Sequence, residues 1–348
     1  MIPAAVPFAS RDPRHHPLAI LTLLLALVLA GCTSKREKEA EIAPPPVNIP
    51  EPPEPEGPTQ AELREARAER NRAANQAAAI NVSALSQSQQ NYYARIEQKL
   101  IDDNQLRRDQ IPMDAPIDAD ILAQNFIQIA LRDEYGSDGA RHAGGAGASA
   151  PLRRWQDPVR IELEFGPSSD TALKREIRGE VADYTTRLEE VSGHSVALTG
   201  DGGNFTVLVL SDDERRDIDT LLPELVPGIP AHDVVALRDL APDIYCSVFA
   251  YSKGNSSSYV HAVALIRSEL SSLLRLSCIH EELAQGMGLA NDSPTVRPSI
   301  FNDDEEFALL TRHDELLLQI LYDPRLRPGM TEAEAAPIVR EIAGELLP

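Results

Sequence analysis

The alternation of apolar and polar residues at 159–165 is the feature that most restricts the fold of this chain. Its apolar members are Val159, Ile161, Leu163 and Phe165. A period of two predicts a strand with one buried face. Residues 170–191 then carry apolar side chains at spacings of three and four and stop before Gly193. That pattern predicts an amphipathic helix directly after the strand.

The remaining patterns predict one α+β domain over residues 117–330. Asp118 or Asp120 is expected to cap a first helix. Short strands are expected at 195–199 and 205–211, then an antiparallel pair of 244–251 with 259–266, and a helix near 269–287. Helices follow, one opened by a capping-box pattern at Thr311–Asp314 and one at 331–348. Such an order predicts a mixed, twisted sheet packed on helices.

The first 31 residues read as a targeting segment. Arg11 and Arg14 precede the apolar run 18–30, which is too short to span a bilayer as a helix. The run ends in Leu29-Ala30-Gly31-Cys32, which resembles the bacterial lipobox. This resemblance implies cleavage before Cys32 and lipid, including palmitate, on that cysteine. We therefore expect a lipoprotein signal peptide at 1–31 and a mature chain anchored in a membrane.

Two segments separate the anchor from the domain. Residues 32–58 are rich in Pro and Glu, which predicts an extended, disordered tether. Residues 59–112 have the composition of a helix with few large apolar residues. We expect a solvated helix there, and a partner-binding helix is the alternative. Thr33 rather than Asp after Cys32 favours the outer membrane, on the periplasmic face of the cell envelope.

The net charge restricts the kinds of ligand that the chain can bind, and the cysteine content indicates its compartment. The formal net charge of −21 disfavours nucleic acid as a ligand. Beyond Cys32, only Cys246 and Cys278 remain, an even pair for an oxidising compartment. We expect them to form a disulfide. No phosphate-binding Gly loop and no Gly-x-Ser-x-Gly motif is present.

Residues 281–291 resemble the helix of a zinc metallopeptidase of the metzincin type, HExxHxxGxxH, when Gly288 is aligned. The glutamate and the glycine match, as Glu282 and Gly288. The three ligand positions hold Glu281, Gln285 and Asn291 instead of histidine, and Asp292 follows. Starting from His280 fails, because Ala284 stands four residues later.

Changed ligands imply changed chemistry. Imidazole suits zinc, whereas amide oxygens are weak zinc ligands. We therefore expect no metal and no cofactor at these positions, and a hydrogen-bond network in their place. Glu282 is the candidate general base, with little to activate unless a metal lowers the pKa of water. A hard cation bound by the carboxylates and amides is the alternative.

Downstream residues extend the resemblance. Ser299-Ile300-Phe301 stands where matrixins carry a Ser-Ile-Met turn, so Phe301 takes the methionine slot. The chain is also similar to the bacterial domain of unknown function 2927 family. This similarity includes the residues of the motif, Leu321-Tyr322-Asp323 and Pro328-Gly329-Met330. This resemblance covers about 117–330 and implies a metzincin-like (zincin-like) scaffold without an assigned activity.

Three functions remain open at this point. The first is a cell-envelope pseudoenzyme lipoprotein whose non-catalytic, metallopeptidase-like domain binds a peptide or an envelope protein. The second is a hydrolase that uses a carboxylate-rich site at Glu281, Glu282 and Asp292. The third is a structural spacer whose long helix is the active part. Outside the motif, Trp155 is expected in the core and His313 at the surface.

Overall fold

The computed structural model describes residues 82–133, 148–302 and 304–348, together with a few residues between 66 and 76. The chain divides into two units, 1–57 and 58–348, and the described residues all lie in the second. The predicted signal peptide, Cys32 and the tether therefore fall outside them. In the described part of the chain, no helix has the length and apolar character needed to span a membrane.

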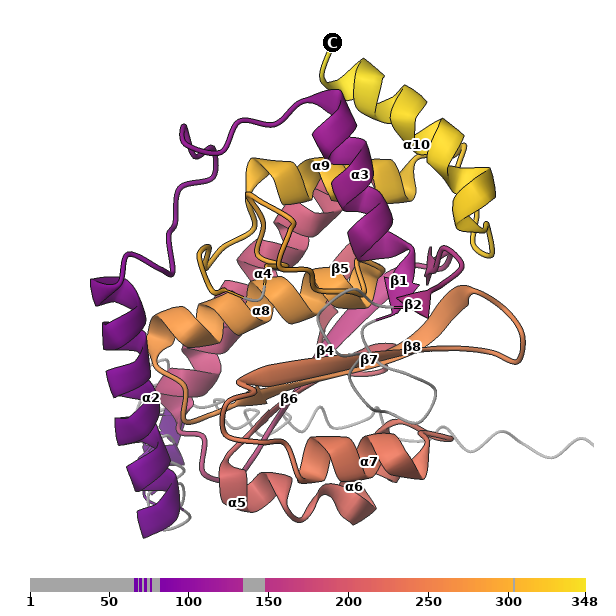
Figure 1. The fold of residues 1–348 in the computed structure, drawn as a ribbon. Coiled ribbons are helices and arrows are strands. Elements are labelled where there is room, and N and C mark those ends of the chain that lie inside the picture. Colours follow the sequence, from indigo (N-terminus) through magenta and orange to yellow (C-terminus); the bar gives the residue numbers. More distant parts are fainter. Residues whose placement is uncertain are drawn as a thin grey trace, which may run out of the picture. The chain divides into compact units, whose positions relative to one another are not determined.

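The main sheet is mixed, with one antiparallel strand at its edge (Figure 1). Four parallel strands lie in the order β5 (Val196–Thr199), β4 (Val159–Phe165), β6 (Phe205–Leu210) and β8 (Ser258–Arg267). On the far side of β8, β7 (Cys246–Ser252) pairs antiparallel with it. The short β3 (Arg154–Trp155) runs parallel to the start of β8. The predicted α+β class, the strand at 159–165 and the antiparallel pair are confirmed.

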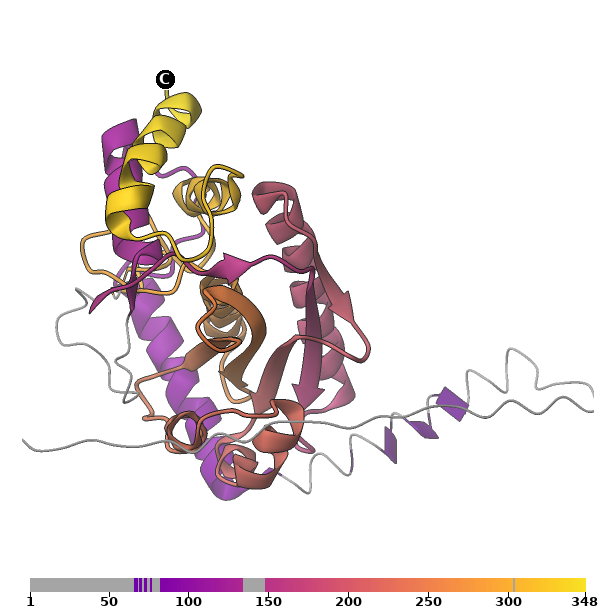
Figure 2. The ribbon, with the colours of Figure 1, turned by 90° about the vertical axis from the view of Figure 1, so that its right-hand side faces the viewer.

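Helices cover both faces of this sheet. On one face lie α4 (Thr171–Ser192) and α8 (Ser272–Met287), and beyond them α3 (Ala119–Ala130), α9 (Arg312–Tyr322) and α10 (Glu332–Leu346). Figure 2, which looks almost along α8, shows α3 and α10 side by side. On the opposite face lie α5 (Asp212–Arg215), α6 (Ile218–Leu225) and α7 (Ala231–Arg238). A two-stranded sheet of β1 (Arg132–Asp133) and β2 (Ala148–Ser149) follows α3.

Strand β6 shows how the sheet separates two hydrophobic cores. Phe205, Val207 and Val209 belong to the larger core, under α4 and α8. Leu208 and Leu210 belong to the smaller one, under α6 and α7. Successive side chains of a strand point to opposite faces, so a strand buried on both sides is almost entirely apolar, and Thr206 is the one polar residue of β6.

The helix boundaries follow the predicted caps. The Asp118 side chain accepts from the backbone N–H of Ile121 at the start of α3. Asp170 caps α4 in the same way, and Gly193 ends it in the left-handed region. At α9, Thr311 and Asp314 form the predicted capping box. The predicted helices that begin after Asp118, Asp170 and Thr311 are therefore confirmed, and α8 and α10 confirm those expected near 269–287 and at 331–348.

The helix predicted within 59–112 is present over Ala84–Asp102, but it is not surrounded by solvent on all sides. Helix α2 (Ala84–Asp102) begins after Ser83 and packs against the domain. Tyr93 is fully buried and its hydroxyl donates to the Pro242 carbonyl. Ser86 is buried too, and its hydroxyl donates to Glu269 at 2.7 Å. A few well-placed residues suffice to dock a helix whose average composition is polar.

Candidate functional site

Helix α8 is fixed at its start by a residue from another helix. Its N-cap, Ser271, makes no side-chain capping bond. Instead, Glu97 of α2 accepts from the backbone N–H groups of Leu273 and Leu274, at 2.8 and 2.9 Å. A carboxylate at this end satisfies donors that the helix leaves unpaired and complements the helix dipole. Helix α2 thus helps to position the motif.

A disulfide joins the middle of α8 to the sheet. Cys246, the first residue of β7, is bonded to Cys278, with a Cα–Cα distance of 5.9 Å. Both cysteines are buried. The predicted disulfide is present, and it holds the edge strand against the motif helix.

Gly288 ends α8 where no other residue would fit well. Its φ is 127°, a conformation that side chains strongly disfavour. A Cβ at this position would lie 2.4 Å from the Arg153 carbonyl oxygen. The glycine of the motif is therefore required by close packing against the segment before β3, as well as by its backbone conformation.

The amide at Gln285 is bonded inside the site. Its Nε2 donates to Asp292 Oδ1 at 2.7 Å, and both residues are buried. This bond closes the turn from the last part of α8 to the segment behind Gly288. The predicted hydrogen-bond network at the ligand positions thus exists for this pair.

Asn291 makes its hydrogen bonds to α3 and not to Gln285. The Asn291 side chain is fully buried, and its Nδ2 donates to the Gln128 carbonyl of α3 at 2.9 Å. Its backbone N–H donates to the Ile129 carbonyl at 3.1 Å. Asn291 therefore ties the chain to α3, and Asp292 occupies the place beside Gln285.

Glu281 and Glu282 lie next to the disulfide. One carboxylate oxygen each from Glu281 and Glu282 lies within 4.8 Å of Cys246 Sγ and of the other. Glu282 is buried and Glu281 is half-buried, and both have partners in the folded chain. The candidate general base Glu282 is therefore next to a disulfide.

These residues do not fit a zinc ion at the metzincin positions. Zinc is bound by thiolate, imidazole or carboxylate, and here only Glu281 is of those types. Gln285 points its N–H toward Asp292, and Asn291 is engaged with α3. The Asn291 Oδ1 is buried without a hydrogen-bond partner, but amide oxygens are weak zinc ligands, so the donor set of these three positions does not suit zinc.

His280 lies deep in the core, beside the motif. Its ring stacks on Tyr184 of α4 at a centroid distance of 4.0 Å. Its Nδ1 accepts from the Leu310 backbone N–H at 3.1 Å. Burial lowers the pKa of His280 from 6.5 to about 3, with a smaller effect from the positive charge of Arg187. His280 is therefore a neutral core residue that packs α8 on α4.

The turn at 299–301 is tied to the start of α9 by one buried carboxylate. Asp314 accepts from the Ser299 hydroxyl at 2.5 Å, from the Thr311 hydroxyl at 2.9 Å and from two backbone N–H groups. Phe301 is fully buried and part of the larger core. The residue in the predicted methionine slot is thus a side chain of the larger core.

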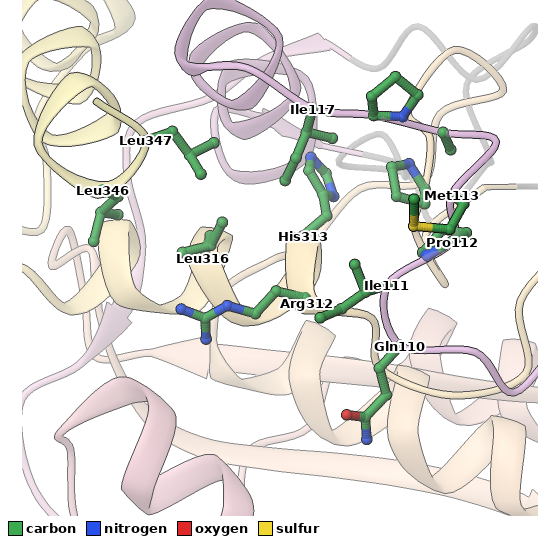
Figure 3. A pocket seen from close by; sticks show the side chains of 13 residues that line it. Gln110, Ile111, Pro112, Met113, Ile117, Arg312, His313, Leu316, Leu346 and Leu347 are labelled. Carbon is green, nitrogen blue, oxygen red and sulfur yellow. The ribbon is translucent and has the colours of Figure 1, made fainter.

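A cavity of about 360 Å³ lies apart from the motif (Figure 3). It is bounded by residues 110–117, by the start of α9 and by Leu346 and Leu347. Figure 3 shows His313 directed toward Ile117. The expectation that His313 is at the surface is wrong, since it is 1% exposed and its Nε2 lies 3.0 Å from Asn125 Nδ2. The docking of α3 across α9 buries it.

Comparison with known proteins identifies the domain. A family model described as Protein of unknown function (DUF2927) matches residues 119–341. The chain belongs to this family. The predicted family membership is confirmed, and the match begins at the first residue of α3. No curated protein and no solved structure matches the chain.

Sequence reasoning missed two residues that position the site of this DUF2927 chain. Glu97 caps α8 from outside the family match, and its sequence context carries no capping signal for a helix so far along the chain. Gln128 offers only its backbone carbonyl to Asn291, which no side-chain pattern reveals. Trp155 is in the core as predicted, and its indole N–H donates to the Gly286 carbonyl at 2.8 Å.

Proposed function

We propose that this protein is a cell-envelope lipoprotein whose DUF2927 domain is a metallopeptidase-like binding module without zinc catalysis. The observation that carries the proposal is the internal hydrogen bonding of the two amides, Gln285 and Asn291, at former ligand positions. Histidines there would hold a metal, whereas these amides close the turn and attach it to α3. The metzincin ancestry itself is part of the proposal and rests on the motif.

The partner that best suits the site is an extended peptide. Among the strands that the structure describes, β7 pairs only with β8, so its other edge has no strand partner. An open edge can add a peptide as a further strand through main-chain hydrogen bonds. The disulfide fixes the start of β7 beside Glu281, so a bound peptide would run past the motif helix.

Charge favours a basic peptide. The chain has a net charge of −21, and the half-buried Glu281 lies beside Cys246, at the start of β7. Opposite charges speed association and select partners more than they raise affinity. A Lys or Arg that reaches Glu281 would fix the register of the peptide on β7.

Chemical changes to the peptide, with the protein left unaltered, test the binding proposal. Peptides selected from a random library by the purified full-length chain would be made again with N-methyl groups on alternate residues. A peptide that adds a strand has its N–H groups toward β7 at every second residue only. Methylation in one register should abolish binding, and methylation in the other should preserve it. Equal effects of both registers, or no selected peptide, would contradict strand addition.

Absence of catalysis needs its own test. The selected peptides would be incubated with the full-length chain and with Glu282→Gln, with and without added Zn²⁺, and analysed by mass spectrometry. We expect no cleavage by either protein. Cleavage by the parent chain that depends on zinc and disappears in Glu282→Gln would favour the hydrolase.

The lipid anchor is tested separately. Cells that express the full chain would be fed an alkyne analogue of palmitate, and the label on the protein would be detected after purification. We expect labelling of the parent and of Cys246→Ser, and none of Cys32→Ser. Fractionation of the envelope would then distinguish the outer from the inner membrane.

A further inference from the structure

Four side chains with metal-ligating atoms gather where β7 meets α8. Cys278, Glu281 and Glu282 are at positions i, i+3 and i+4 of the helix, so they share one face. Cys246 of β7 faces them and is bonded to Cys278. The Cys246 sulfur and one oxygen from each glutamate lie within 4.8 Å of one another. Neither Gln285 nor Asn291 belongs to this cluster.

The disulfide withholds two of these four donors. Thiolate sulfur binds metals strongly, whereas disulfide sulfur does not carry the necessary charge. A dithiol reductant would transfer two electrons and two protons to the bond, giving two thiols and its own disulfide. A divalent cation would then displace one proton from each thiol into solvent.

We propose that the reduced chain binds one thiophilic divalent cation, such as Zn²⁺, through Cys246, Cys278, Glu281 and Glu282. Zinc accepts two thiolates and two carboxylates in a tetrahedron, at about 2.3 Å to sulfur and about 2.0 Å to oxygen. The donor atoms of such a site are about 3.5 Å apart. In the folded chain the Cys246 sulfur and the two carboxylate oxygens are up to 4.8 Å apart. Rotamer changes of the two glutamates and of the released cysteine would shorten these separations to the distance that zinc requires.

The proposed site shares Glu281 and Glu282 with the peptidase-like motif, but it takes its other two ligands from the cysteines and differs in chemistry. It is one turn earlier on α8 than Gln285 and faces β7. All four positions are filled by protein, which is the pattern of a structural site, since a catalytic zinc keeps one position for water. Reduction would thus exchange one link between β7 and α8 for another, and the domain would take up metal without becoming a hydrolase.

Cobalt is the probe for this site. The full-length chain would be reduced with a phosphine under argon and titrated with Co²⁺, followed by its visible absorption. We expect a one-to-one complex with tetrahedral d–d bands and a thiolate-to-cobalt charge-transfer band, bleached by Zn²⁺. The oxidised chain should show neither band. Glu281→Gln and Glu282→Gln should each weaken binding at least about ten-fold, whereas the matched control Glu341→Gln on the exposed face of α10 should not.

If the reduced chain stays folded, two results would overturn the proposal. One is equal cobalt binding by the oxidised and reduced chains. The other is a reduced chain that keeps its native circular dichroism and shows no charge-transfer band. If reduction alone unfolds the chain, Zn²⁺ should restore its circular dichroism in the parent but not in the double variant Glu281→Gln, Glu282→Gln. Failure of Zn²⁺ to restore the parent also counts against it.

Discussion

The buried histidine beside the motif makes the stability of this domain depend on pH. His280 is 7% exposed, stacks on Tyr184 and accepts from the Leu310 N–H through Nδ1. Protonation would place a charge in the core and remove that acceptor. His280→Asn is the informative replacement, because an amide oxygen can accept from Leu310 but does not titrate.

The magnitude follows from the two pKa values. Burial lowers the pKa of His280 in the folded chain from 6.5 to about 3. Because the folded pKa is depressed, the unfolded chain binds the proton first as the pH falls. The stability is therefore complete above 6.5 and is lost as the pH falls toward 3. Between pH 7 and pH 5 the free energy of unfolding therefore falls by about 2 kcal/mol, which is about 1.4 in the logarithm of the equilibrium constant.

Urea unfolding followed by tryptophan fluorescence gives the measurement, since Trp155 is the only tryptophan and is buried. The free energies of unfolding of parent and His280→Asn would be compared from pH 7 to pH 5. The other histidines and the carboxylates are the same in both proteins, so their contributions cancel in the difference. We expect the parent to lose about 2 kcal/mol relative to the variant. A difference that stays constant over this range would refute the assignment of His280 as a neutral core residue.

Further predictions concern the elements that hold α8, measured by the same unfolding assay near neutral pH. Gly288→Ala should cost at least about 2 kcal/mol, because it puts a Cβ against the Arg153 carbonyl at a disfavoured φ. The matched change Gly344→Ala, in open space within α10, should raise stability by about 0.5–1 kcal/mol, and equal effects would contradict the packing argument. Glu97→Ala should cost about 1–2 kcal/mol, since two N–H groups of α8 lose their acceptor; no change would mean that water replaces it. The double change Cys246→Ala, Cys278→Ala should cost about 3–4 kcal/mol for a separation of 32 residues, and a stability unchanged from the parent would exclude the cross-link.

Local patterns predicted most of the regular elements. The caps at Asp118, Asp170 and Thr311 and the end at Gly193 are decided by residues close in sequence, and the helices begin and end there. The period-two strand at 159–165 is likewise a local signal. The three short helices on the opposite face, α5 to α7, were not predicted, because four to eight residues give too little periodicity to distinguish them from loops.

The candidate site was predicted only where one helix determines it. Glu281, Glu282 and Gln285 are on α8, so their positions follow from its geometry. Asn291 lies after the turn, and its direction depends on where α3 docks, which is a tertiary contact. The burial of His313 has the same cause. Long-range packing, which spacing along the chain does not encode, determines the positions of both residues.

Zinc content of the purified chain with its disulfide intact tests the central claim most directly. The chain would be dialysed against excess Zn²⁺, passed through a desalting column and analysed by plasma emission spectroscopy. We predict much less than one zinc per chain, and no change on replacing Gln285 by leucine. One tightly held zinc per chain, lost in Gln285→Leu, would contradict the claim that the amides at these positions have replaced a metal.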